Sequence, residues 1–486
     1  MIEFHAYDLA TMLPELFLLG ATCLILLIDL FLKQSQRDTT HWLTIAALAI
    51  TGVLVWYRAL PDGAALSAFN DMFVLDGMAT ILKIFILLVT LAVCLYGRAY
   101  LRDRKLFVGE FYLLLLFACL GMMLLVSAGN LIPLYLGLEL LTLSQYALVA
   151  LNRDSSASSE AAIKYFVLGA MASGLLLYGM SMIYGATGTL DLAKIHVVVG
   201  DMVHSEHRTL LAFGLVFMIT GIAFKFGAAP FHMWIPDVYE GAPTAMVVFV
   251  GSAPKLAAFG MAYRLLEGAM GGMHGDWTLM LSVLSVLSLA IGNVFAIAQT
   301  NLKRMLGYST ISHIGFLLLG FINATPAGYA AALFYTISYA LMAIVAFGVI
   351  LLLARAGFEA EQIDDFKGLN QRNPWYAGVM AIAMFSLAGV PPLFGFFAKL
   401  MVLKAVIDAG QMWLAIVAIV FAIIGLYYYL RVVKVMYFDD PADDAPLALP
   451  DDLAFRWALS INGLALLVLG VAWGPLLDWC TRAFAT

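Results

Sequence analysis

Charged residues are scarce in this chain of 486 residues: only 12% are Asp, Glu, Lys or Arg, while 63% are hydrophobic. Ordinary soluble domains are about 25% charged and about 45–50% apolar, so no soluble core could hold this excess. The composition therefore excludes a soluble protein and predicts an integral membrane protein. The net charge of −6 adds little, because in membrane proteins the placement of charges matters more than their sum.

Cysteine motifs and nucleotide-binding loops are also missing. Cys23, Cys94, Cys119 and Cys480 are scattered, with no CxxC pair and no histidine nearby at ligand spacing, so we expect neither a metal site nor a disulfide framework. No GxGxxG motif follows a strand, no P-loop is present, and no paired intramembrane histidines suit two haems. We therefore expect no cofactor in this chain. Any transport work would draw its energy from an ion gradient or from a partner.

Long hydrophobic runs dominate what is present. A membrane-crossing helix needs about 20 apolar residues, whereas barrel strands alternate over about 10 residues, so the runs predict an all-α polytopic membrane protein with about fourteen helices. The predicted helices lie near residues 11–31, 42–60, 73–96, 111–128, 130–151, 161–186, 209–232, 242–265, 277–298, 305–322, 328–354, 374–407, 411–437 and 455–476.

The basic residues predict an orientation. Fifteen of the 26 Lys and Arg residues lie in the odd-numbered connections, and five lie in the even-numbered connections and the C-terminus. Because Lys and Arg concentrate on the cytoplasmic side, both termini are expected on the outer, periplasmic side. The acidic, proline-rich stretch at 438–454 is then a solvated cytoplasmic linker before the last helix, which occupies 455–486.

Two of the predicted helices contain breaks. The seventh is interrupted by "GAAP" at 227–230 and the twelfth by "AGVPPLFG" at 388–395, because proline removes a backbone donor and clashes with the preceding turn. Breaks at matching places in two halves of a membrane protein indicate a transport site near mid-membrane. The alternative is that these prolines only kink their helices.

The spacing of the breaks also predicts the organisation of the chain. They lie five helices apart, and an odd offset reverses orientation, so the two units are expected to be inverted repeats. The expected units are three N-terminal helices at 1–110, a first five-helix repeat at 111–265 with its break near Pro230, and a second at 277–437 with its break near Pro391 and Pro392.

Five charged residues inside the predicted helices are the candidate site: Glu139, Lys164, Lys225, Lys255 and Lys399. An unpaired charge in hydrocarbon is expensive, so these groups should face the protein interior and each other. Burial favours a neutral amine and a nearby carboxylate favours a charged one, so a lysine whose carboxylate neighbour comes and goes can bind and release a proton. The alternative is that the charges are ion pairs that only hold helices together.

Two histidines extend this candidate site, and two further lysines are left out of it. His232 lies seven residues after Lys225, and its ordinary pKa near 6.5 suits a proton relay; His313 in the tenth helix is a similar candidate. Each could instead be a hydrogen-bonded structural residue. Lys83 and Lys404 are expected to pair locally or to extend toward the membrane surface.

Four motifs carry a resemblance to a known family. The segments "LGLELLTLSQYALV", "FKFGAAPFHMWIPDVYEGAPTAM", "QTNLKRMLGYSTISHIGFLLLG" and "SLAGVPPLFGFFAKL" resemble the antiporter-like subunits of respiratory complex I, and the resemblance runs over nearly the whole chain. It implies fourteen helices with inverted repeats of helices four to eight and nine to thirteen. It also implies proton translocation by Glu139, Lys164, Lys225, Lys255 and Lys399, with Glu139 biasing Lys225 and Lys399 facing the exit.

The resemblance further implies partners and a location. The partners would be the lipid bilayer and other membrane-arm subunits, including a second antiporter-like subunit and small membrane subunits, with no nucleic acid among them. Other subunits would bind NADH, FMN, iron–sulfur clusters and quinone, and the complex would lie in a bacterial inner membrane. A subunit of a multi-subunit sodium/proton antiporter, driven by a gradient, shares the family and stays as the alternative, and a purely structural scaffold is a third.

Overall fold

The computed structural model of the protein describes residues 6–202, 208–355, 357–441 and 450–485, and helices dominate it. In chain order, the elements are α1 (Ala6–Thr11), α2 (Leu13–Asp29), η1 (Gln34–Gln36), α3 (Asp38–Tyr57), β1 (Leu66–Ala68), β2 (Phe73–Leu75), α4 (Gly77–Asp103), α5 (Gly109–Val126), α6 (Leu131–Val149), α7 (Ser156–Thr187), α8 (Leu192–Met202), α9 (Arg208–Phe226), α10 (Trp234–Gly241), α11 (Thr244–Val250), α12 (Ala253–Leu266), η2 (Gly271–Met273), α13 (His274–Ile297), α14 (Leu302–Ile322), α15 (Pro326–Leu353), η3 (Ile363–Phe366), α16 (Leu369–Arg372), α17 (Pro374–Ala388), α18 (Phe394–Asp408), α19 (Met412–Phe438), α20 (Leu453–Val471) and α21 (Gly474–Arg482).

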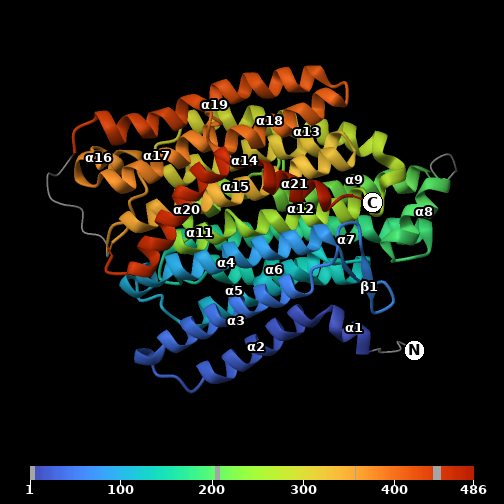
Figure 1. Ribbon diagram of the computed structural model, residues 1–486, viewed down its shortest axis with the longest axis horizontal. Helices are drawn as coiled ribbons and strands as arrows, with labels where there is room; N and C mark the ends of the chain where they lie inside the picture. Colours follow the sequence, from blue (N-terminus) through green and yellow to red (C-terminus); the bar gives the residue numbers. More distant parts are fainter. Residues whose placement is uncertain (1–5, 203–207, 356, 442–449, 486) are drawn as a thin grey trace.

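The long helices run side by side as one bundle (Figure 1). Helices α2 and α3 form one edge of the view, α19 forms the opposite edge, and the helices of the middle of the chain fill the space between them. The short elements α1, β1 and α8 and the C-terminal end of the chain gather at one end of the bundle, while α16 lies at the other (Figure 1). Both described ends of the chain therefore lie at the same end of the bundle.

Twelve stretches in the described part of the chain are long and apolar enough to cross a membrane. The first predicted run is α2, whose 17 residues make it shorter than these twelve. The twelfth run, at 374–407, is split into α17 and α18, with 15 residues each. All-helical membrane architecture is thus confirmed, whereas the prediction of fourteen spans is not decided by the lengths of single helices.

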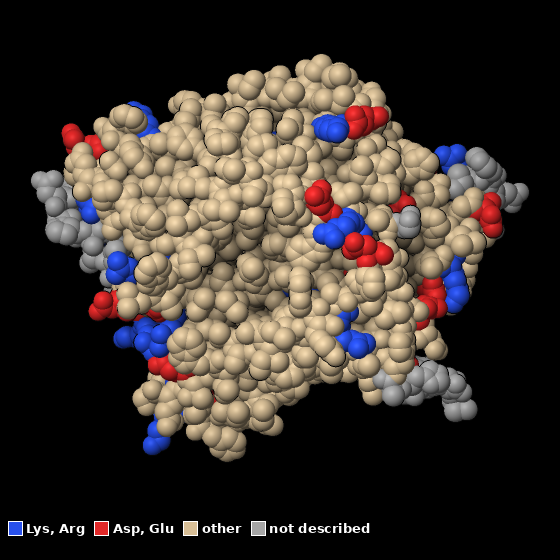
Figure 2. Space-filling view, viewed as in Figure 1, with Lys and Arg blue, Asp and Glu red and all other residues tan. Residues whose placement is uncertain are grey.

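The surface fits a bilayer. Figure 2 shows a broad band without charged side chains across the middle of one face, between charged groups toward the two ends. Large apolar side chains are exposed along the outer helices, among them Leu136, Phe166, Leu279 and Ile423. Because every backbone group of a helix is satisfied within the helix, such a bundle can place these side chains in lipid.

Polar residues set where many of the helices begin. The side chains of Asp76, Asn130, Ser155, Asn301, Thr325, Asn373 and Asp452 each accept a hydrogen bond from a backbone N–H in the first turn of the helix that follows. These caps satisfy donors that the helix leaves free at its N-terminus. The starts of these helices are therefore determined by the local sequence, where a polar residue precedes an apolar run.

Helix α15 is the central element of the bundle. It packs against α4, α11, α12, α14, α17, α18, α20 and α21. The apolar windows of α14, α15 and the α11–α12 segment are fully buried inside the chain, whereas only about a third of those in α7, α19 and α20 are buried. The inner helices are thus shielded from lipid by the chain itself, and charged groups on them face other protein segments.

The eighth predicted helix differs from the prediction of one continuous span over 242–265. It is divided at Gly251 and Ser252 into α11 and α12, and Pro254 lies in the first turn of α12. The seventh helix ends at Phe226, directly before the predicted interruption at 227–230, and the chain continues after the break as the short α10. Residues 442–449 of the expected acidic linker lie outside the described residues.

Candidate functional site

Two helices, α9 and α17, end inside the bundle, and their C-terminal ends have the same local structure. α9 ends before Gly227 and α17 before Gly389, whose φ angles of +83° and +85° are left-handed. Each glycine N–H donates to the carbonyls three and four residues earlier, at 3.0 and 2.8 Å for Gly227 and at 3.0 Å for both bonds of Gly389. Glycine adopts this conformation without the strain of a Cβ, and Pro230 and Pro392, three residues on, cannot continue the helical hydrogen bonds.

Lysine amines occupy these two helix ends. Lys255 Nζ donates to the carbonyl of Phe226 at 2.7 Å, and Lys399 Nζ donates to the carbonyls of Leu387 and Ala388 at 3.0 and 2.8 Å. Both lysines are buried, with exposures of 1% and 9%. The C-terminus of a helix carries partial negative charge, so each interrupted helix offers an amine a favourable position away from water.

Lys225 lies one residue before the end of α9 and is also buried. Its Nζ donates to the Thr142 hydroxyl at 3.0 Å and to the Gln145 amide oxygen at 2.9 Å, both on α6. Since Lys255 bonds to the carbonyl of the next residue, Phe226, the two amines meet at the same helix end. The structure therefore brings Lys225 and Lys255 together, as the candidate site requires.

Glu139 lies one helical turn before Thr142 on α6, but it does not form an ion pair with Lys225. Its carboxylate instead accepts a hydrogen bond from the Ser173 hydroxyl on α7. Glu139 is only half-buried, so it sits toward the outside of the chain rather than in its centre. Glu139 shares a face of α6 with Thr142 and Gln145, which bond to Lys225. The acid and the amine themselves each bond to neutral groups and not to each other.

The partners of Lys225, Lys255 and Lys399 differ from those of another buried lysine. Lys83 Nζ on α4 lies 2.6 Å from the carboxylate of Glu15 on α2, with side-chain exposures of 1% and 0%, so its charge is paired with an acid of another helix. In the described part of the chain, the amines of Lys225, Lys255 and Lys399 have no carboxylate within 4.0 Å. These three amines are the buried ones whose charge no direct acid neutralises.

His313 belongs to a network of buried hydroxyls. Its Nδ1 lies 2.6 Å from the Tyr335 hydroxyl and its Nε2 lies 3.1 Å from the Tyr429 hydroxyl, which in turn lies 2.5 Å from the Ser309 hydroxyl. Three residues further along α14, the ring of Phe316 has the Lys399 amine 5.0 Å from its centroid. His313 thus lies one turn from the aromatic face that Lys399 covers.

His232 lies in the segment between α9 and α10, and no described hydrogen bond joins it to Lys225 or Lys255. Its Nδ1 is buried with no hydrogen-bond partner among the described residues. The described hydrogen bonds of Lys225 and Lys255 go to Thr142, Gln145 and the Phe226 carbonyl. A relay through His232 would therefore need an intervening group, and the residue stays a prediction.

Lys164 differs most from its expected place. Its side chain is 45% exposed and pairs with Glu160 at 2.8 Å and with Asp237 at 2.9 Å. Arg304 also bonds to Asp237 and to Glu240, both at 2.8 Å. These residues line an open cleft of about 410 Å³ at the end of α7 and α10, so Lys164 belongs to a surface cluster and not to the buried group.

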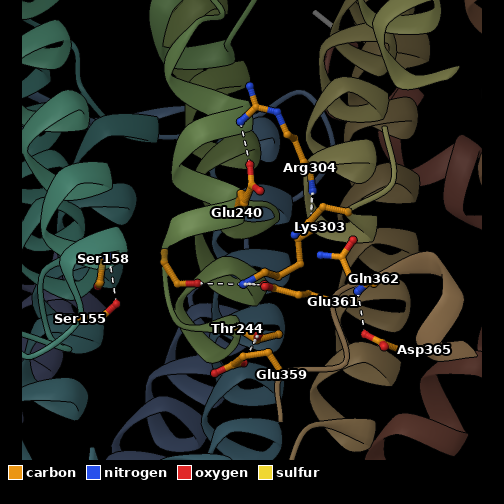
Figure 3. A network of polar contacts seen from close by, with 12 residues as sticks. Ser155, Ser158, Glu240, Thr244, Lys303, Arg304, Glu359, Glu361, Gln362 and Asp365 are labelled. Atoms are coloured by element: carbon orange, nitrogen blue, oxygen red, sulfur yellow. Dashed lines mark hydrogen bonds and ion pairs between the residues drawn. The ribbon is translucent and has the colours of Figure 1, made fainter. Parts of the chain in front are cut away.

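Beside this cleft, the connection between α15 and α17 crosses to the first half of the chain (Figure 3). Lys303 is buried, and its amine bonds to the carbonyl of Ala242 at 3.2 Å and pairs with Glu361 at 3.1 Å. Glu359 accepts hydrogen bonds from the hydroxyls of Tyr100 and Thr244. Lys303 on α14 therefore joins the segment before α11 to the connection between α15 and α17.

Sequence reasoning missed the neutral partners of the charged groups. Thr142 and Gln145 follow Glu139 at intervals of three residues, in "ELLTLSQ", and this spacing places them on one face of α6. Ser173, Tyr335 and Tyr429 carry no comparable signal, because hydroxyl residues are common in membrane helices as packing and hydrogen-bonding groups. Only the helix packing reveals which hydroxyls meet the charged side chains.

Comparison with known proteins places this geometry in a family. A family model described as "NADH:quinone oxidoreductase/Mrp antiporter, TM" matches residues 128–425, a range that contains Glu139, Lys225, Lys255 and Lys399. This range includes both helix breaks. The resemblance that the four sequence motifs carry is therefore confirmed.

Relatives match the whole chain. A protein of Thioalkalivibrio sulfidiphilus named NADH-quinone oxidoreductase subunit N is 53% identical over all of both chains. A subunit N of Xanthomonas euvesicatoria pv. vesicatoria is 55% identical over 98% of this chain and 97% of its own. A chain in the structure of respiratory complex I from Thermus thermophilus with bound aureothin is 30% identical and has a TM-score of 0.81. The match covers 96% of this chain and 98% of that chain.

Proposed function

This chain belongs to the NADH:quinone oxidoreductase/Mrp antiporter family of transmembrane proteins, and from that premise we propose how its buried lysines move protons. It is an antiporter-like membrane-arm subunit of NADH-quinone oxidoreductase, a proton-pumping enzyme, and its relatives are named subunit N.

The observation that carries the mechanism is the set of three buried amines without a carboxylate partner. Removing an amine from water disfavours its charged form, and a nearby acid restores that form. Lys225, Lys255 and Lys399 are held by hydroxyl, amide and carbonyl oxygens, which can accept a hydrogen bond from either the neutral or the charged amine. Such groups can gain and lose a proton when a charge nearby changes.

We propose that protons pass along these groups in order. Lys225 and Lys255 meet at the end of α9. His313 lies one turn from Phe316 on α14, and the Lys399 amine lies over the Phe316 ring near the end of α17. Glu139 biases Lys225 from α6 by approaching it or leaving it. The exposed cluster around Lys164 suits the entry of protons from water, because its acids and Lys164 lie in an open cleft.

The repeat organisation is proposed on the same basis. The matching glycines, prolines and hydrogen bonds at the two breaks support inverted repeats of helices four to eight and nine to thirteen, at 111–265 and 277–437. Fourteen crossings are supported if α2 and the broken α17–α18 pair are counted. An even number of crossings agrees with both described ends lying at one end of the bundle (Figure 1).

Partners and location follow from the family. We propose that the chain lies in a bacterial inner membrane with both termini periplasmic, beside a second antiporter-like subunit and small membrane subunits. The half-buried Glu139 supports a neighbour on the face of α6 and α7, because a carboxylate at membrane depth needs a polar surface to cover it. NADH, FMN, iron–sulfur clusters and quinone would be bound by other subunits.

The test replaces Lys225 by alanine in the intact complex and measures proton pumping in inverted membrane vesicles. The Lys225→Ala complex should assemble and lose pumping. The matched pair Lys399→Ala and Lys404→Ala tests the same idea on α18, where Lys399 is buried and Lys404 is exposed. Only Lys399→Ala should lower pumping, and full pumping by Lys225→Ala would leave the lysines as structural groups.

A second measurement separates the redox-driven subunit from a subunit of a gradient-driven sodium/proton antiporter. Deleting this chain should abolish NADH oxidation that is coupled to proton movement in the same vesicles. Under the antiporter alternative, NADH oxidation would continue unchanged, and the deletion would remove only sodium-dependent proton exchange.

A further inference from the structure

A small, partly open cavity lies between Ser173, the hydrogen-bond partner of Glu139, and Lys225. It has a volume of about 20 Å³ and is lined by residues of α6, α7 and α9, among them Thr142, Ser173 and Lys225. One water molecule needs a cavity of at least about 10–15 Å³ measured in this way, together with two to four polar partners. The size and the lining therefore fit a single water molecule.

The polar groups around this cavity form a line from acid to amine. The Ser173 hydroxyl donates to the Glu139 carboxylate at one end. At the other end, Lys225 Nζ lies 3.0 Å from the Thr142 hydroxyl. Since Ser173, Thr142 and Lys225 all line the cavity, a water molecule there would have three polar neighbours without any movement of the helices.

A fourth polar group supports a bound water. The hydroxyl of Tyr146 is buried and has no hydrogen-bond partner among the described residues, while the residue itself is only 8% exposed. This hydroxyl lies directly against Gly169, where an added Cβ would come within 1.7 Å of it, and Gly169 is part of the cavity wall. Buried polar groups are seldom left without a partner, and a water in the cavity would supply one.

We propose that Ser173 is a positioning residue that holds Glu139 away from Lys225, and that the cavity binds one water molecule through which a proton passes between them. The proton leaves the Lys225 ammonium for the water oxygen, the water gives a proton to the Ser173 oxygen, and Ser173 passes its own proton to the Glu139 carboxylate. Lys225 ends neutral and Glu139 ends protonated, while the water and Ser173 are unchanged. This inference rests on the proposed function.

The role proposed for Ser173 depends on its hydroxyl group and not only on the shape of its side chain. A direct bond between Glu139 and Lys225 would hold the proton on the amine, because an ion pair favours both charged forms. The serine hydroxyl competes for the carboxylate and keeps one water between the two groups. The proton can then move either way when a charge outside this cluster changes.

The experiment compares Ser173→Val with Ser173→Thr in the intact complex. The two side chains have nearly the same shape, and only threonine keeps the hydroxyl. Proton pumping per assembled complex should fall at least about tenfold in Ser173→Val, since hydrogen bonds to charged groups are strong, and should be largely retained in Ser173→Thr. Ser181→Val, two turns further along α7 at an exposed position, should pump normally.

Each outcome decides the proposal. Equal pumping by the valine and threonine variants, whether normal or impaired, would overturn it, because the hydroxyl would then not matter. If Ser173→Val fails to assemble, Tyr146→Phe removes at nearly constant shape the hydroxyl that lies against Gly169 in the cavity wall, and it should also slow pumping; normal pumping there would overturn the water site. A normal Ser173→Val beside an inactive Lys225→Ala would reject only this inference, whereas full pumping by Lys225→Ala would reject the proposed function.

Discussion

The amine of Lys225 lies 2.9 Å from the amide oxygen of Gln145, a neutral group on α6, and does not bond to the carboxylate of Glu139, six residues earlier on the same helix. A neutral acceptor stabilises the ammonium less than an acid would, so it leaves the amine able to lose its proton. This choice of partner separates a lysine that can carry protons from a lysine that only holds helices together.

Replacing Gln145 by glutamate should therefore lock Lys225. The new carboxylate would lie within ion-pair distance of the amine and strengthen its hold on the proton about ten- to thousandfold. We expect normal assembly and strongly reduced proton pumping, measured by a pH-sensitive dye in vesicles. Gln145→Met, which has a similar length and no charge, is the control, and it should retain more pumping than Gln145→Glu; the reverse order would contradict the prediction.

The buried pair of Lys83 and Glu15 should behave in the opposite way. Neither Glu15 oxygen has a further hydrogen-bond partner in the described part of the chain, so Lys83→Met would leave an uncompensated buried carboxylate. Removing one member of such a pair costs about 3–5 kcal/mol. The assembled complex should become less abundant and melt at a lower temperature, while pumping per assembled complex stays normal.

A double variant provides the control for this pair. Glu15→Leu combined with Lys83→Met replaces both charges by apolar groups, and it should recover much of the lost stability. If the double variant is as unstable as Lys83→Met, or if the single variant loses pumping without losing stability, Lys83 would belong to the proton path.

Gly389→Ala should disturb Lys399 through the helix break. An added Cβ would lie 2.8 Å from Cδ of Lys399, and the left-handed φ of +85° would add strain of about 1–2 kcal/mol. Gly410, at φ +74°, has no atom within 4 Å of an added Cβ, so Gly410→Ala carries the strain alone. Both variants should be slightly destabilised, and only Gly389→Ala should pump poorly. Equal pumping by the two would show that Lys399 tolerates displacement.

The connection that carries Glu361 should respond to pH through Asp365. Burial raises the pKa of this carboxyl group, assisted by the charges of Glu361 and Asp364, although the backbone N–H of Gln362 opposes the rise. A raised pKa in the folded state means that this group adds stability as pH falls through that pKa and withdraws it at higher pH. Lowering the pH from 7 toward 4 should therefore slow local opening of the segment.

Asp365→Asn checks this sign. The asparagine oxygen can still accept the 2.8 Å hydrogen bond from the Gln362 N–H, but it carries no charge beside Glu361 and Asp364. Amide hydrogen exchange at residues 361–366 should be slower in the variant than in the wild type at pH 7, after correction for intrinsic rates, and the difference should shrink as the pH is lowered and Asp365 becomes protonated. Faster exchange at pH 7 would mean that the charge stabilises the segment.

The local parts of the candidate site were predictable from the sequence. Proline cannot continue the helical hydrogen bonds and glycine adopts a left-handed φ without strain, so "GAAP" and "AGVPPLFG" located these two breaks. Lys225, Lys255 and Lys399 were found because charge is rare in apolar runs. The break at Gly251 and Ser252 was missed: Pro254 stands in the first turn of α12, but a single proline in an apolar run is equally compatible with a continuous, kinked helix.

The amino-acid sequence by itself determined the apolar spans, the polar caps at their ends, the places where two helices stop, and the family. Each of these depends on residues that are neighbours along the chain. Only the tertiary structure decided that Lys83 meets Glu15, that Lys164 lies in a surface cleft, and that Lys225 meets Gln145 while Ser173 takes Glu139. Those partners come from different helices, and a buried charge takes the oxygen that helix packing brings within reach, which no local pattern records.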